Sequence, residues 1–216
     1  MDGWFTSWLA WRSHPAPWLL LSFALFVVRA RFHARGPGDR FAQRAEWVHL
    51  LGLPYLALLA GAASPTGMGL AGVDWVLSLG LGIPIAVAAV LLIYVARRQA
   101  SRLSSMQETR HQLASDGPAG IVDAAALQLH WAFVRDAMKL WLGPYWGVWA
   151  SLPVNGLLAA IRPGRERRVR PLSRLEPWLT DLVALTVTTA LFAIVPNWWL
   201  TWVAHAALMV TMSKTR

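Results

Sequence analysis

Long apolar stretches alternate with short polar connectors along almost the whole of this 216-residue sequence. A helix needs ~20 residues to cross the ~30 Å hydrocarbon core of a bilayer, and most of these stretches approach that length. The stretch over residues 119–161 is too long for one crossing, and Gly143-Pro144 is its natural break. We therefore predict one all-α, polytopic transmembrane bundle of about seven spans, near residues 17–28, 45–63, 73–96, 119–142, 145–161, 177–195 and 197–212.

The first residues, 1–14, differ from the predicted spans. Trp4, Trp8 and Trp11 are spaced by four and three, so that a helix places them on one face. No basic region precedes the apolar stretch, as it would in a secretory signal. We expect an amphipathic segment that lies in the membrane interface.

The composition agrees with a membrane protein. Hydrophobic residues make up 56% of the chain and charged residues only 14%, with a mean hydropathy of +0.42. The 14 tryptophans fit the headgroup region, where an indole satisfies both its apolar body and its N–H. The chain has no cysteine, which excludes disulfides and thiolate metal sites.

The basic residues predict an orientation. Under the seven-span arrangement, 17 of the 20 lysines and arginines lie in alternate connectors and at the C-terminus, on one side. The positive-inside rule then places the N-terminus outside and the C-terminus in the cytoplasm, in a multi-pass protein of the cell membrane. Because orientation and anionic lipid headgroups account for the net charge of +9, nucleic acid is excluded as a partner.

Polar residues inside spans are costly and are therefore functional candidates. His130 and His205 lie near the middle of apolar segments, where an imidazole needs a partner. Asn155 is expected to donate a hydrogen bond to another helix. Asp136 and Lys139 are three residues apart and can neutralise each other. Glu46 and Asp181 fit the positive ends of their helices, and the other candidates are His49, Tyr94, Arg135 and Asn197.

Motifs for metal or nucleophilic catalysis are missing. The sequence holds no HExxH, GxSxG, SxxK or aspartyl pair, so no metal site and no catalytic residue is predicted. His49 and His130 each follow an alanine by four residues, a spacing that leaves room for a planar macrocycle over the helix. These two histidines are the candidate ligand-binding residues for a pigment or haem.

Two short motifs resemble those of the CPBP (Abi) intramembrane protease family. The stretch from Pro196 and Asn197 through Trp202 to His205 and Ala206 is similar to the last motif of that family. Upstream, the stretch from His130 to Arg135 is similar in spacing to its first motif, Glu-Glu-x-x-x-Arg. The resemblance covers about the last 95 residues. It implies that His130 and His205 converge in one cavity, together with Arg135 and Asn197.

The departures from that family concern its catalytic groups. His130 and Trp131 occupy both glutamate positions, and Met209 replaces the asparagine that follows the last histidine. No histidine lies between Leu140 and Trp178, so the middle motif has no counterpart. Without the carboxylate that activates water, the resemblance implies a scaffold that has kept its fold and lost its reaction.

We therefore expect a non-catalytic integral membrane protein, a structural or assembly subunit of a larger membrane complex. Its partners are the lipid bilayer and other membrane proteins, and small residues such as Gly80 and Gly82 favour helix association. One alternative is a divergent protease that uses His130 and His205 with Asp136 or Glu46. The other is a pigment-binding or haem-binding subunit, and the sequence leaves open whether a pigment, quinone or lipid is bound.

Overall fold

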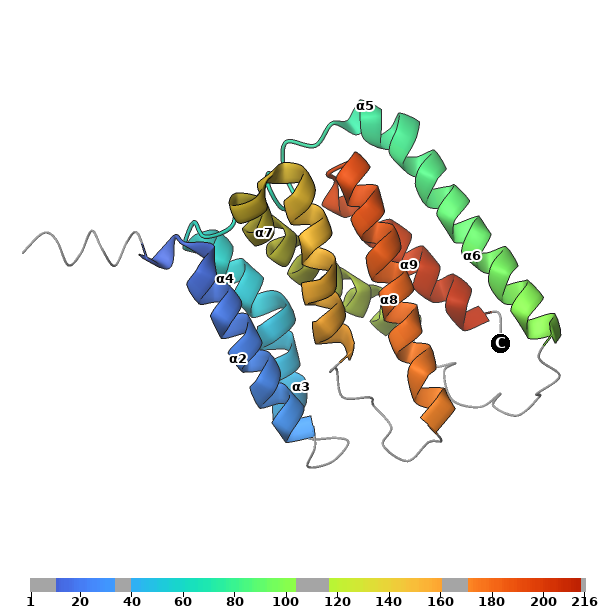
Figure 1. Cartoon of the computed structure of the whole chain (residues 1–216), viewed down its shortest axis with the longest axis horizontal. Helices are drawn as coiled ribbons and strands as arrows, with labels where there is room; N and C mark the ends of the chain where they lie inside the picture. The colour runs from blue at the N-terminus through green and yellow to red at the C-terminus, as the bar shows by residue number, and fades with distance from the viewer. Residues whose placement is uncertain (1–10, 34–39, 104–116, 161–170, 215–216) are drawn as a thin grey trace, which may run out of the picture.

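A computed structural model describes residues 11–33, 40–103, 117–160 and 171–214, and all regular structure in these residues is helical (Figure 1). The elements, labelled as in Figure 1, are α2 (Pro15–His33), α3 (Arg40–Trp47), η1 (Val48–Gly52), α4 (Leu53–Leu59), α5 (Trp75–Leu77), η2 (Ser78–Gly82), α6 (Ile83–Leu103), α7 (Gly117–Ala160), α8 (Pro171–Ile194) and α9 (Trp198–Lys214). The all-α prediction is confirmed for this part of the chain.

Helices occupy each of the seven predicted stretches, with shifted ends. The elements α3, η1 and α4 follow one another without a break, and so do α5, η2 and α6. The predicted break inside α7 is confirmed, because Gly143 has φ +80° and ψ 170° within the helical run. This left-handed region suits a residue without a Cβ. The chain then turns back, and a Cβ on Gly147 would lie 2.4 Å from Lys139 Cα, so the two halves of α7 cross closely.

Length and hydropathy single out one helix among the described residues as long and apolar enough to cross a membrane, Trp75–Gln99. The helices Pro15–Val28 and Leu179–Ile194 are apolar but shorter. The first half of α7 carries Arg135, Asp136 and Lys139, whose charges lower its hydropathy. Trp4 and Trp8 of the predicted interfacial segment lie outside the described residues.

Two π-helical turns widen the helices, and the sequence analysis did not predict them. In η1 the Leu53 N–H bonds to the Val48 carbonyl, and in η2 the Ile83 N–H bonds to the Ser78 carbonyl, each five residues back. A proline follows directly in both cases, Pro54 and Pro84, and a proline inside a helix clashes with the carbonyl four residues earlier. The wider turn relieves that clash, and such turns are frequent at functional sites.

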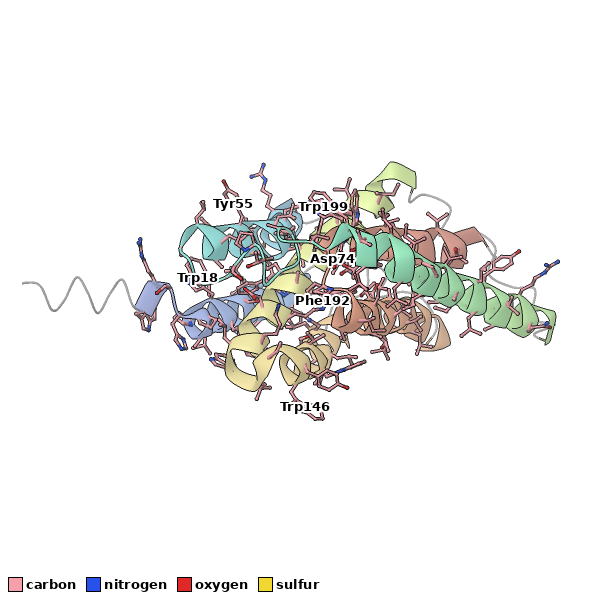
Figure 2. The ribbon with its side chains drawn as sticks, turned by 90° about the horizontal axis from the view of Figure 1, so that it is seen from above. Trp18, Tyr55, Asp74, Trp146, Phe192 and Trp199 are labelled. Atoms are coloured by element: carbon pink, nitrogen blue, oxygen red, sulfur yellow. The ribbon has the colours of Figure 1, made fainter. Side chains whose placement is uncertain are left out.

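The first half of α7 is the central element of the bundle. Helix α7 as a whole packs against α2, η1, α4, α8 and α9, and the residues of its first half from His130 to Ala137 are all buried. Helix α6 lies at one edge of the bundle and packs mainly on α9 (Figure 1). Seen from above, Tyr55 and Trp146 lie on opposite outer faces and Phe192 lies inside (Figure 2).

The segment between α4 and α5 closes one end of the bundle. Its Met68 is fully buried, and the Gly69 carbonyl accepts a hydrogen bond of 2.9 Å from the Trp198 N–H at the start of α9. Gly69 has φ +73°, and a Cβ there would lie 2.8 Å from a ring carbon of Phe192. A glycine is therefore required at this contact.

Candidate functional site

Polar side chains gather inside the bundle, and large apolar side chains cover much of its outside. The buried polar residues of the described chain are Ser22, His49, Ser78, Gln128, His130, Arg135, Asp136, Ser151, Asn155, Thr188, Thr189, Asn197, Thr201 and His205. Ser151 and Thr201 bond to carbonyls of their own helices, and most of the others fall into four groups according to their contacts.

The first group joins α2, η1 and α7. The His49 and His130 rings are tilted, with centroids 4.5 Å apart, and His49 Nε2 lies 3.0 Å from Ser22 Oγ in a hydrogen bond. His49 belongs to the π-helical turn η1, which places its ring at this point of the core. The two candidate ligand-binding histidines thus lie together.

A cavity of about 20 Å³ adjoins these two rings. Its polar walls are His49, His130, Asn155 and Asp181, contributed by η1, both halves of α7, and α8. Its apolar walls include Trp131. The cavity has room for about one water molecule.

This packing leaves no space for a macrocycle. A macrocycle bound by His130 needs open space over Ala126, four residues earlier on the same helix. Ala126 is 1% exposed and packs in a core cluster with Leu50 and Leu208. The His49 ring itself covers the neighbouring side of His130. The geometry therefore disfavours a pigment or haem at these histidines.

The second group joins α7, α8 and α9. Gln128 Nε2 donates a hydrogen bond of 3.0 Å to Thr188 Oγ1 and lies 3.1 Å from His205 Nδ1. The Trp131 ring stacks on the His205 ring at a centroid distance of 5.0 Å and an angle of 10°. Because the two rings are nearly parallel, this contact between Trp131 and His205 is one of ring stacking.

Arg135 extends the second group, and its side chain is 0% exposed. Its Nη2 is 3.5 Å from the hydroxyl oxygens of Thr188 and Thr189, and its guanidinium lies 5.0 Å from the centre of the Phe192 ring. Both threonine distances exceed the ~2.7–3.2 Å of an ordinary N–H···O bond. Within the described part of the chain, Arg135 Nε and Nη1 have no hydrogen-bond partner.

The third group joins α7 to the closing segment, which is the stretch of residues 60–74 between α4 and α5. Asp136 Oδ2 accepts a hydrogen bond of 2.7 Å from the Ser64 N–H, and its Oδ1 forms an ion pair of 3.7 Å with Lys139. Lys139 Nζ also donates to the Gly67 carbonyl. The predicted neutralisation of Asp136 by Lys139 is confirmed. The carboxylate is engaged in holding backbone and lies next to neither His130 nor His205 in these contacts.

The fourth group joins η2 to the start of α9. Asn197 Oδ1 accepts a hydrogen bond of 3.2 Å from the Leu200 N–H, which caps α9, while its Nδ2 donates one of 2.9 Å to Ser78 Oγ. Ser78 Oγ in turn donates to the Asp74 carbonyl. Asn197 therefore has a structural role that the sequence analysis did not assign to it.

The structure joins one residue of each motif, since Arg135 and His205 are linked through Thr188 and Gln128. The His130 ring of the first motif contacts His49. Sequence reasoning missed Ser22, Gln128 and Thr188. A glutamine within an apolar stretch was the available signal for Gln128.

One expectation about the interior is wrong. Asn155 is 0% exposed, yet neither amide atom of its side chain has a hydrogen-bond partner among the described residues. Contrary to the expectation, it donates to no other helix of the described ranges, and it lines the cavity beside His49 and His130.

Neither the arrangement of possible metal ligands nor the comparisons with known proteins assigns a function to the site. No group of three or more histidine, aspartate or glutamate side chains in the described ranges is arranged to hold a metal ion. Comparison with protein-family models, with curated proteins and with solved structures gives no match. The resemblance to the CPBP family therefore rests on the two short motifs alone.

Proposed function

We propose that this chain is a multi-pass membrane protein whose seven helical stretches cross the bilayer. The observation that carries the proposal is the distribution of polarity. Wholly buried Arg135, Gln128 and His205 contrast with widely exposed apolar side chains such as Val76, at 85%, and Leu92, at 70%. In soluble proteins charged side chains are almost never fully buried unless they are paired.

The same arrangement supports an N-terminus outside and a C-terminus in the cytoplasm. The C-terminal ends of α2 and α6 and the N-terminal ends of α3 and α8, which flank arginine-rich connectors, lie toward one side of the bundle in Figure 1. The segment between α4 and α5 and the turn between the two halves of α7 lie toward the other side.

Reporter fusions test this topology. Fusions after Arg110 and after Arg168 are expected to report the cytoplasm, and a fusion within residues 64–72 is expected to report the outside. A cytoplasmic signal from the fusion in residues 64–72 contradicts the seven-span arrangement.

Within the membrane, we propose that the protein is a non-catalytic subunit of a larger complex. The contacts of Asp136, Lys139 and Asn197 hold helices and loops together. Arg135 approaches two threonines and a phenylalanine in place of a carboxylate. These contacts suit a scaffold better than a site that activates water.

Helix α6 supports association with another membrane helix. Gly80 of η2 and Pro84 and Ala88 of α6 are exposed and spaced by four, so they form one narrow face of small residues. A Cβ on Gly80 would meet no atom within 4 Å, whereas one on Gly82 would lie 2.4 Å from Leu200 of α9. Gly82 thus serves packing within the chain, and Gly80 is open to a partner helix.

Cysteine cross-linking in native membranes tests the subunit proposal. The chain has no cysteine, so Ala88→Cys introduces a single thiol on this face, and Ala24→Cys places one at an exposed alanine of α2 as a matched control. We expect Ala88→Cys, and not Ala24→Cys, to form a cross-link of fixed size with another membrane protein. Equal labelling by lipid-phase reagents without any cross-link would count against association through α6.

A divergent CPBP-type protease is the alternative function. It is favoured by the chain of contacts between Arg135 and His205. Arg135 approaches Thr188, and Gln128, which donates to Thr188, lies beside His205. The purified chain and its His130→Ala variant are reconstituted with labelled membrane substrates. We expect no cleavage by either, and cleavage by the native chain that His130→Ala abolishes would replace the scaffold proposal with the protease.

A further inference from the structure

The small cavity beside His49 and His130 carries an inference that does not depend on the proposed function. It lies between η1, the two halves of α7, and α8, and its volume is about 20 Å³. A cavity needs roughly 10–15 Å³ of such volume to hold one water molecule. The space therefore admits one molecule of that size and excludes larger organic ligands.

Asn155 makes this cavity a polar site. Its side chain is wholly buried, it lines the cavity, and neither Nδ2 nor Oδ1 has a hydrogen-bond partner in the described residues. A buried amide without partners is destabilising, and native proteins satisfy nearly all such groups with protein atoms or ordered water. An asparagine at this place is explained when a small molecule in the cavity completes its hydrogen bonds.

The other polar walls supply further hydrogen-bonding groups. His49, His130 and Asp181, whose side chains carry imidazole and carboxyl groups, line the same space. A water molecule both donates and accepts, so it can accept from Asn155 Nδ2 and donate to an oxygen or an unprotonated ring nitrogen. Buried waters typically make about three such bonds.

We infer that the cavity binds one ordered water molecule, held by the amide of Asn155 and shared with His49, His130 and Asp181. Through this water, Asn155 in the second half of α7 is linked to His49 in η1 and Asp181 in α8. It also extends the hydrogen bond between Ser22 and His49 toward Asp181 across the core.

The chain offers a selective spectroscopic test, because Asn155 and Asn197 are its only asparagines. In the full-length protein labelled with ¹⁵N-asparagine, two side-chain amide groups are observed, and Asn155→Leu assigns them. Asn197 is equally buried but bonds to Ser78 and Leu200, so it serves as the internal control. We expect the Asn155 amide protons, and not those of Asn197, to show a nuclear Overhauser effect with long-lived bound water.

A second variant removes the space and keeps the amide. Ala159 lines the cavity, so Ala159→Leu fills it, and Ala206→Leu is the matched control at a partly buried alanine of α9. We expect Ala159→Leu to abolish the water signal at Asn155, with Ala206→Leu leaving it intact and both leaving the Asn197 signals in place. If Ala159→Leu does not fold, the measurement on the native chain decides alone.

Three results would overturn the inference. The first is the absence of a bound-water signal at Asn155 in the native protein. The second is its persistence in folded Ala159→Leu, which would place the water elsewhere. The third is a stoichiometric metal ion in the purified native chain that Asn155→Leu removes, which would identify a metal in place of water.

Discussion

Helix α6 and the first half of α7 differ in which side chains they bury and which they expose. Helix α6 is apolar and at the edge, with Leu91 56% exposed, whereas α7 buries Gln128, His130 and Arg135 almost completely. In a water-soluble protein, apolar side chains are the ones most often buried and charged side chains lie on the surface. The reversed order in these two helices is what an apolar surrounding selects, and it supports the membrane proposal more than the length of any one helix.

The buried polar side chains Gln128 and Asp136 of α7 are stabilised by hydrogen bonds to neighbouring parts of the bundle. Gln128 reaches α8 and α9, and Asp136 reaches the closing segment. Buried polar groups cost free energy unless such partners exist. Two kinds of substitution test the contrast between α6 and α7. One places a charge on the exposed face of α6, and the other removes a hydrogen-bonding side chain of α7.

The largest effect is expected from charge on the outer face of α6. Leu91→Arg exchanges a favourable residue at mid-helix for one that costs ~2.5–3.5 kcal/mol to insert. We expect the amount of chain in the membrane fraction to fall strongly at equal synthesis, as measured by quantitative immunoblotting.

Leu59→Arg is the matched control, because Leu59 is also exposed, at 68%, but ends α4, where an arginine side chain can reach the interface. Normal accumulation of Leu91→Arg would show that this face of α6 does not meet lipid.

The next effect concerns the tie between Asp136 and the closing segment. Asp136→Ala removes the acceptor of the Ser64 N–H and leaves Lys139 without its ion pair. Hydrogen bonds to charged groups contribute ~1.5–3 kcal/mol, and we expect a loss of that size in the free energy of unfolding. Unfolding in mixed micelles, followed by circular dichroism, measures it.

Asp74→Ala serves for comparison, because Asp74 caps α5 at an exposed position and its loss should cost only ~1 kcal/mol. If both variants lose the same stability, the buried contact of Asp136 has no special weight.

A smaller effect is expected from Gln128. Gln128→Leu removes its hydrogen bond to Thr188 and its contact with His205, and a net loss of ~0.5–1.5 kcal/mol follows. The control Gln99→Leu alters an exposed glutamine of α6 and should leave the thermal midpoint unchanged. A midpoint for Gln128→Leu above that of the native chain would mean that the polar link is not needed for stability.

The positions of the helices could be predicted from the sequence, because apolar runs and the Gly143-Pro144 break are local signals. The π-helical turns also had a local signal that was missed, since Gly-x-Pro occurs at both Gly52-Leu53-Pro54 and Gly82-Ile83-Pro84. These turns matter because they contain His49 and Ser78.

The site was less predictable, because it depends on which helices touch. Sequence spacing could pair Asp136 with Lys139 on one helix, but not Asp136 with Ser64 or His130 with His49 across helices. Asn155 shows the limit most clearly. Its residue type predicted a hydrogen-bond partner, and only the packing of α7 against α8 shows that it faces a cavity.

The smallest effect is expected from Arg135→Met, although Arg135 is the largest fully buried polar side chain in the described core. Its guanidinium approaches two threonine hydroxyls at 3.5 Å and the Phe192 ring at 5.0 Å, and no carboxylate compensates its charge among the described residues. Replacing buried ionic groups by apolar side chains of similar volume is often neutral or stabilising. Methionine is unbranched and flexible enough to fill much of the same space. We therefore expect the thermal midpoint of Arg135→Met in detergent to equal or exceed that of the native chain. Arg135→Ala should lower the midpoint, because it leaves a void beside Phe192. A marked loss of stability in Arg135→Met as well would mean that the native protein compensates this charge with a bound anion, and adding chloride would then raise the midpoint of the native chain but not that of the variant.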